Sequence, residues 1–95
     1  MSRLEAKINA EVKNYLSTLP QCWFYKTTDR FVVGVPDILV CYKGYFIALE
    51  LKSDTGKPTP HQMDKLLKII LAGGRSAIIR DLEEVKAIIK AIDNL

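Results

Sequence analysis

Asp37, Glu50 and Lys52 stand at the ends of two otherwise apolar segments, where buried strands usually carry no charge. Carboxylates supply the oxygen ligands that hard divalent cations prefer, and an ammonium group can stabilise a developing anion. Two carboxylates that face each other repel, and each raises the pKa of the other unless a cation lies between them. If the fold brings these three groups together, a metal ion is the simplest way to stabilise them.

Residues 36–52 are predicted to form a β-hairpin that turns at Lys43-Gly44. With a two-residue turn, paired residues keep a constant sum of residue numbers, so Asp37 lies directly opposite Glu50. Cross-strand Cβ atoms are about 4.5–5.5 Å apart and side chains alternate between faces, so Lys52 shares the face of Glu50, diagonal to Asp37. A four-residue loop gives the same register, whereas a three-residue loop would separate the carboxylates. Lys-Gly is a weaker turn signal than Asn-Gly or Asp-Gly.

The composition predicts one small domain spanning residues 1–95. The net charge of +3 is compatible with a polyanionic partner but is below the excess of many DNA-binding domains. No apolar segment approaches the roughly 18 residues of a membrane span, and no signal peptide is recognisable, so we expect a cytoplasmic, intracellular protein without membrane contact. Cys22 and Cys41 lack metal-type spacing and are expected to be reduced core residues.

Periodicity and capping signals divide the chain into seven elements. In chain order, we predict a helix over 2–19, a strand over 22–28, hairpin strands over 36–42 and 45–52, a helix over 59–72, a strand over 76–79 and a helix beginning at Asp81. The second helix connects strands that should therefore be parallel, whereas the hairpin is antiparallel. The fold class is α/β, with a mixed β-sheet flanked by helices in the order α-β-β-β-α-β-α.

The second predicted helix begins with a capping box, in which Thr59 is the N-cap and Gln62 closes the box. Its apolar residues are expected to form a buried stripe made of Met63, Leu66, Leu67, Ile70 and Leu71. His61, the only histidine, is interpreted as a solvated first-turn residue rather than a general base. On the first helix, Glu5 falls inside the apolar stripe, so it either belongs to the site or complements the helix dipole.

Pro36-Asp37 followed by Glu50-Leu51-Lys52 resembles the PD-(D/E)XK nuclease superfamily. Within that superfamily, Gly34-Val35-Pro36-Asp37, Glu50-Leu51-Lys52, Gly56-Lys57 and Gln62 together resemble a VRR-NUC domain, over residues 5–81. Archaeal Holliday-junction resolvases share the acidic site but resemble the Gln62 region less well. The resemblance implies a restriction-endonuclease-like core. A buried structural ion pair is the alternative reading of the charged cluster.

The resemblance also implies roles for individual residues. The implied Mg²⁺ or Mn²⁺ ligands are Asp37, Glu50, the backbone carbonyl of Leu51, and Glu5. Lys52 would lie beside the attacking water or the scissile phosphate. Gln62 would lie near the catalytic groups, although its capping role explains it equally well.

The implied function is a metal-dependent, structure-selective endonuclease for branched DNA such as a Holliday junction or a flap. The candidate phosphate contacts are Lys26, Arg30, Lys57 and Lys65, each of which is otherwise a solvated surface charge. Symmetric cutting of a four-way junction needs two active sites, so we expect a homodimer. The resemblance is compatible with a bacterial or phage origin. The alternative function is a catalytically inactive nucleic-acid-binding or assembly module.

Overall fold

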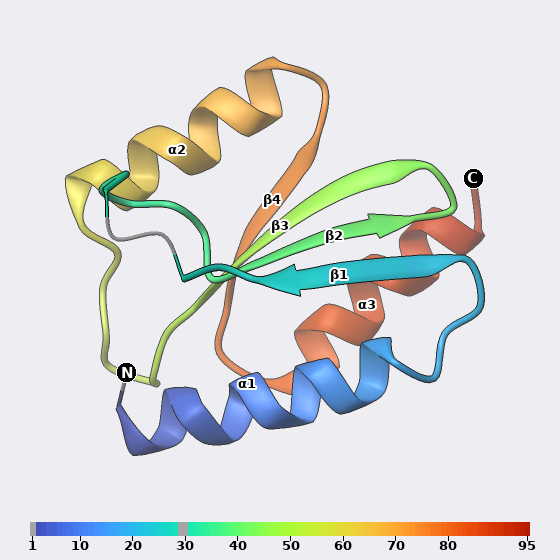
Figure 1. Ribbon diagram of the computed structural model, residues 1–95, viewed down its shortest axis with the longest axis horizontal. Helices are drawn as coiled ribbons and strands as arrows, with labels where there is room; N and C mark the ends of the chain where they lie inside the picture. The colour runs from blue at the N-terminus through green and yellow to red at the C-terminus, as the bar shows by residue number, and fades with distance from the viewer. Residues whose placement is uncertain (1, 29–30) are drawn as a thin grey trace.

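One four-stranded mixed sheet runs through the protein in a computed structural model that describes residues 2–28 and 31–95 (Figure 1). The elements are α1 (Arg3–Leu16), β1 (Cys22–Lys26), β2 (Ile38–Tyr42), β3 (Tyr45–Leu51), α2 (Pro60–Leu71), β4 (Arg75–Ile79) and α3 (Leu82–Asp93). The strands follow the order β1-β2-β3-β4 across the sheet. The predicted α/β class and the order α-β-β-β-α-β-α are confirmed.

The hairpin turns where the sequence predicts it. Tyr42 pairs with Tyr45 and Ile38 pairs with Leu49, so the two-residue turn is confirmed. Both turn residues have positive φ, 51° for Lys43 and 86° for Gly44, the combination that a type I′ turn requires. The same register, continued by one residue, sets position 37 opposite position 50.

The crossover through α2 makes β4 parallel to β3, as predicted. Leu51 is paired with Ile79, and the backbone N–H of Lys52 donates to the Ile79 carbonyl at 3.0 Å. The carboxyl ends of β3 and β4 therefore lie side by side, so the loops that follow them leave the same end of the sheet.

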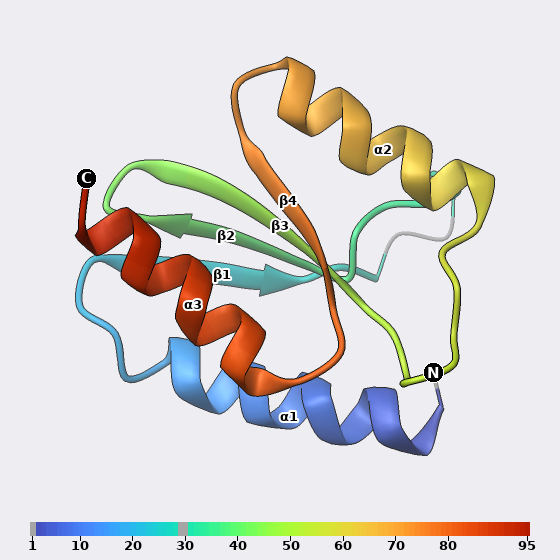
Figure 2. The same ribbon diagram turned by 180° about the vertical axis from the view of Figure 1, so that it is seen from behind.

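The two faces of the sheet are covered unequally (Figures 1 and 2). Helices α1 and α3 pack on one face and enclose the main core. Its most deeply buried members include Val12, Ile38, Val40, Ile79 and Val85. Helix α2 contacts β4 and β3 on the other face, where the Ser76 hydroxyl donates to the Leu66 carbonyl at 2.8 Å. In the described part of the chain, no helix is both long and apolar enough to cross a membrane.

The predicted buried stripe of α2 is largely wrong. Leu66 is buried, but the other members are about half exposed or more, namely Met63, Leu67, Ile70 and Leu71. The stripe borders a groove lined by residues 76–78 of β4. Among the described residues β4 is the edge strand on this side of the sheet, so no further strand lies beneath the stripe. Cys41 is also exposed rather than in the core, because no helix of the described chain packs on that face of β2. Cys22 is half-buried, and both thiols are free as predicted.

The loop before β2 touches the beginning of α2 at Gly34. Gly34 has a φ of 85°, and a Cβ added there would lie 2.6 Å from the carbonyl carbon and oxygen of His61 and 2.9 Å from the Gln62 nitrogen. No L-residue side chain fits so close to backbone. Glycine is therefore required at this position for the α2 N-terminus to approach the segment before β2 that carries Asp37.

Replacing two glycines of nearly equal φ should separate backbone strain from packing. Gly44→Ala meets no atom within 4 Å, so it should lower the free energy of unfolding by about 1–2 kcal/mol through strain alone. Gly34→Ala adds the clash with His61 and Gln62 and should lower it by about 1–3 kcal/mol more. Urea unfolding followed by circular dichroism measures both. Equal losses in the two variants would contradict the tight contact at Gly34.

Candidate active site

The charged cluster lies at the end of the sheet where β3 finishes and β2 begins. The start of α1, the loop after β3 and the start of α2 gather at this end (Figures 1 and 2). The hairpin contributes two carboxylates and a lysine, and the helix starts contribute a further carboxylate and an amide. Side chains from four separate parts of the chain can therefore act on one small volume.

Asp37 is held in place by the neighbouring strand. Its Oδ2 accepts a hydrogen bond from the backbone N–H of Leu51 at 2.7 Å, and its Oδ1 lies 3.7 Å from the ammonium nitrogen of Lys26. Thr27 secures the backbone at the same point, because its hydroxyl donates to the Pro36 carbonyl at 2.7 Å. Asp37 therefore faces Glu50 as a fixed carboxylate that is 23% exposed.

Glu50 is the one charged residue buried among those that the structure describes, with 2% of its surface exposed. Burial raises its pKa to about 8, and hydrogen bonding to Asp37 and the charge of Asp37 act in the same direction. Lys52 opposes this shift by lowering the pKa. The Oε1 atom of Glu50 is buried and has no hydrogen-bond partner among the described residues. A proton or a cation would satisfy this oxygen.

Lys52 and Gln62 both reach the other carboxylate oxygen of Glu50. The Lys52 ammonium lies 3.9 Å from Oε2, and the Gln62 side-chain N–H donates to Oε2 at 3.3 Å. Gln62 also closes the capping box, since its Oε1 accepts from the backbone N–H of Thr59 at 2.9 Å. Gln62 can therefore be both a helix cap and a member of the site, because its amide oxygen caps α2 while its amide nitrogen faces Glu50.

Glu5 reaches the site from the first turn of α1. Its backbone N–H is capped by the Ser2 hydroxyl at 3.1 Å, and its Oε2 accepts from the backbone N–H of Ser53 at 3.4 Å. The negative charge of Glu5 contributes to the raised pKa of Glu50. Glu5 thus occupies a first-turn position and also faces the loop that follows Lys52.

Arg80 is a positioning residue that the sequence did not indicate. Its guanidinium donates to the carbonyl of Ser53 and, at 2.8 Å, to the carbonyl of Gly56. Gly56 in turn lies against the stem of Lys52, since an added Cβ would be 3.6 Å from the Lys52 Cδ. Arg80 follows Ile79, the parallel partner of Leu51. This strand register, had it been known from the sequence, would have placed Arg80 beside the loop that follows Lys52.

The donor set fits a hard divalent cation. Asp37 and Glu50 provide facing carboxylates, and the buried Oε1 of Glu50 has no other partner in the described chain. Within residues 2–28 and 31–95, no three His, Cys, Asp or Glu side chains form a metal-type group. The implied set therefore depends on two carboxylates and the Leu51 carbonyl, and Glu5 stays a predicted additional ligand.

The four predicted phosphate contacts have different surroundings. Lys26 is engaged with Asp37, and the Lys65 ammonium lies 3.8 Å from Asp64 Oδ2. Lys57 is exposed in the loop that overhangs the site. Arg30 lies outside the described residues.

Comparison with known proteins supports the fold. No family model matches the chain, and no curated protein matches it. A solved structure titled "VRR_NUC domain" superposes with a TM-score of 0.79 and 22% identity, covering 94% of this chain and 97% of that one. A second, titled "VRR_NUC domain protein", gives a TM-score of 0.74 and 13% identity, covering 96% and 88%. This chain has the VRR_NUC fold. The fold implied by the sequence resemblance is thereby confirmed, and the candidate site occupies one end of a VRR_NUC sheet.

The raised pKa of Glu50 predicts a pH-dependent stability in metal-free protein. Between about pH 4.5 and 8 the folded state binds a proton that the unfolded state has lost, so the free energy of unfolding should fall as pH rises. The loss should reach about 1 kcal/mol per pH unit, and Glu50→Gln should remove it. Thermal or urea unfolding in EDTA across this range measures the slope. Glu83→Gln, at a side chain that is 80% exposed, is the matched control and should keep the wild-type slope. An unchanged slope in Glu50→Gln would show that another group titrates.

Proposed function

We propose that this protein is a metal-dependent, structure-selective endonuclease that hydrolyses phosphodiester bonds of branched DNA, such as a Holliday junction or a flap. The observation that carries the proposal is the buried Glu50 facing Asp37, with Lys52 and Gln62 on the same carboxylate. The VRR_NUC fold and the names given to the two similar structures support it further.

Asp37, Glu50 and the Leu51 carbonyl would hold Mg²⁺ or Mn²⁺, with Glu5 completing the set. When bound, the cation would neutralise phosphate oxygens and lower the pKa of a bound water. Asp37 suits this role because the Leu51 N–H already fixes one of its oxygens. Glu50 suits it because binding would replace the proton that burial otherwise favours.

Lys52 and Gln62 would act on the reacting groups through their fixed positions. The water oxygen forms a bond to phosphorus while one P–O ester bond breaks, and negative charge grows on the phosphate oxygens. The Lys52 ammonium, with its side chain only 14% exposed, would stabilise that charge. Gln62 would orient Glu50 through the amide N–H that contacts Oε2.

Substrate binding would use the basic residues around this end of the sheet. Lys57 and Lys65 lie on the loop and helix that border the site, and Lys26 adjoins Asp37. Each would contact phosphate rather than bases, so recognition would depend on the shape of the DNA.

Cleavage assays with labelled four-way junction, flap, single-stranded and duplex DNA test this proposal. Wild type should cut a branched substrate only with Mg²⁺ or Mn²⁺. Lys52→Ala and Asp37→Asn should each lower the rate by at least about 100-fold. The first removes the ammonium that would stabilise the developing negative charge, and the second removes a carboxylate that would hold the cation. Lys90→Ala removes an exposed lysine on α3 and should retain activity.

Two outcomes would count against this mechanism. Full activity in Lys52→Ala, or activity without a divalent ion, would show that these residues do not perform the reaction. Binding of branched DNA without cleavage under any metal condition would favour the inactive binding module. A rise in melting temperature of the wild type, but not of Asp37→Asn, on adding Mn²⁺ would report metal binding separately from turnover.

We propose in addition that the protein acts as a homodimer, since two sites are needed to cut a four-way junction symmetrically. The exposed stripe of α2 beside β4, made of Met63, Leu67, Ile70 and Leu71, is the apolar surface that a second copy would cover.

Light scattering coupled to size exclusion tests the dimer and its surface together. Wild type should elute with the mass of two chains, and Leu67→Glu should give a monomer because a buried unpaired charge opposes association. Ala87→Glu, at an exposed position of α3, should stay dimeric. A wild type that is monomeric at micromolar concentration would refute the dimer.

A further inference from the structure

Two aromatic side chains on the edge strand β1 stand uncovered on the sheet. Trp23 is 63% exposed and Tyr25 is 48% exposed. Their ring centroids are 6.3 Å apart and their planes are inclined by only 8°. Two large rings that lie side by side form a contiguous apolar patch, and such exposed patches often mark a contact with a partner.

The strand register places these rings on the same face as the candidate site. Residues paired across the sheet share a face and form rows, and the three successive rows are Trp23–Cys41–Phe46, Tyr25–Leu39–Ala48 and Asp37–Glu50. Successive rows are about 6.8 Å apart along the strands. Tyr25 is therefore one row, and Trp23 two rows, from the carboxylates.

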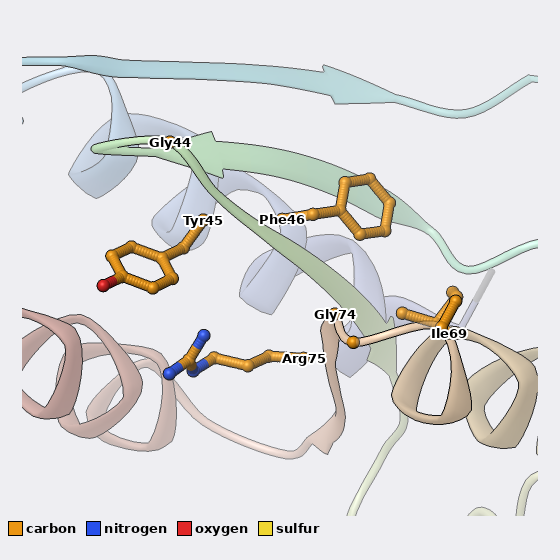
Figure 3. Close-up of a pocket in the computed structure, with 8 residues that line it drawn as sticks. Gly44, Tyr45, Phe46, Ile69, Gly74 and Arg75 are labelled. Atoms are coloured by element: carbon orange, nitrogen blue, oxygen red, sulfur yellow. The ribbon is translucent and has the colours of Figure 1, made fainter.

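Helix α2 leaves this part of the face open. It contacts β3 and β4, and Phe46 and Ile69 line one pocket between β3 and the end of α2 (Figure 3). Tyr45 and Arg75 also line this pocket, but they lie on the face of the sheet opposite to Trp23 and Tyr25. The guanidinium carbon of Arg75 is 4.8 Å from the ring centroid of Tyr45 (Figure 3). Within the part of the chain that the structure describes, no helix packs on the Trp23–Tyr25 face over β1 and β2.

We propose that Trp23 and Tyr25 form a stacking platform for unpaired nucleobases, which holds a single-stranded arm of the substrate beside the scissile phosphate. This inference rests on the proposed nuclease function and adds a substrate feature to it. Every base has a flat π-surface, so aromatic residues bind single strands with little sequence preference.

The surroundings of the platform favour a nucleic acid over an apolar protein segment. The row of rings leads directly to the carboxylates and to the ammonium groups of Lys26 and Lys52. The chain as a whole carries a net charge of +3. A single strand crossing from the rings to the site would place bases on the aromatics and a phosphate at the charged end.

Trp23 is the only tryptophan of the chain, so its fluorescence reports directly on the platform. The experiment uses Lys52→Ala in EDTA, which prevents cleavage, titrated with oligothymidine and with blunt duplex of equal length. Oligothymidine should quench the tryptophan emission and the duplex should not. Labelled oligothymidine should bind Trp23→Ala about tenfold more weakly than the parent by anisotropy, while Trp23→Phe should retain binding. Tyr45→Ala removes an exposed aromatic from the other face and is the matched control.

Unchanged emission with oligothymidine, or equal affinity of Trp23→Ala and its parent, would overturn the platform. A shift of the emission with protein concentration in the absence of DNA would also overturn it, because the face would then be a contact between copies of the chain. Neither result bears on whether the wild type cuts branched DNA with Mn²⁺. Conversely, stacking without any cleavage would support the platform and refute the nuclease.

Discussion

The apposition of Asp37 and Glu50 is the constraint on which the rest of the site depends. The Lys43-Gly44 turn sets the register, and a shift of one residue would send one carboxylate to the other face of the sheet. Burying Glu50 opposite another carboxylate disfavours its charged form, which raises its pKa to about 8. Unfavourable arrangements of this kind lower the stability of the fold, and in proteins they are concentrated at functional sites.

The elements around this pair each limit its freedom. The capping box of α2 directs the Gln62 amide to Glu50, and Gly34 permits the helix start to come close enough for that contact. On the other side, Arg80 holds the loop that covers Lys52. Preorganised groups of this kind need little rearrangement when charge develops, which is the property that electrostatic catalysis uses.

The two faces of the sheet have different roles. One face packs against α1 and α3 and contains the main hydrophobic core. The other carries the carboxylates, the exposed rings of Trp23 and Tyr25, and only a partial cover from α2. Because side chains alternate along each strand, one set of strands can provide both a stable core and an accessible working surface.

The sequence by itself determined the hairpin, the order of elements and the convergence of Asp37, Glu50 and Lys52, since these follow from local turn geometry and side-chain alternation. Tertiary packing decided the rest. Whether the apolar stripe of α2 would be buried depended on where the sheet ends, and the role of Arg80 depended on a parallel pairing between distant segments. Periodicity shows that a helix has an apolar side, but only the packed fold shows how much of that side another element covers.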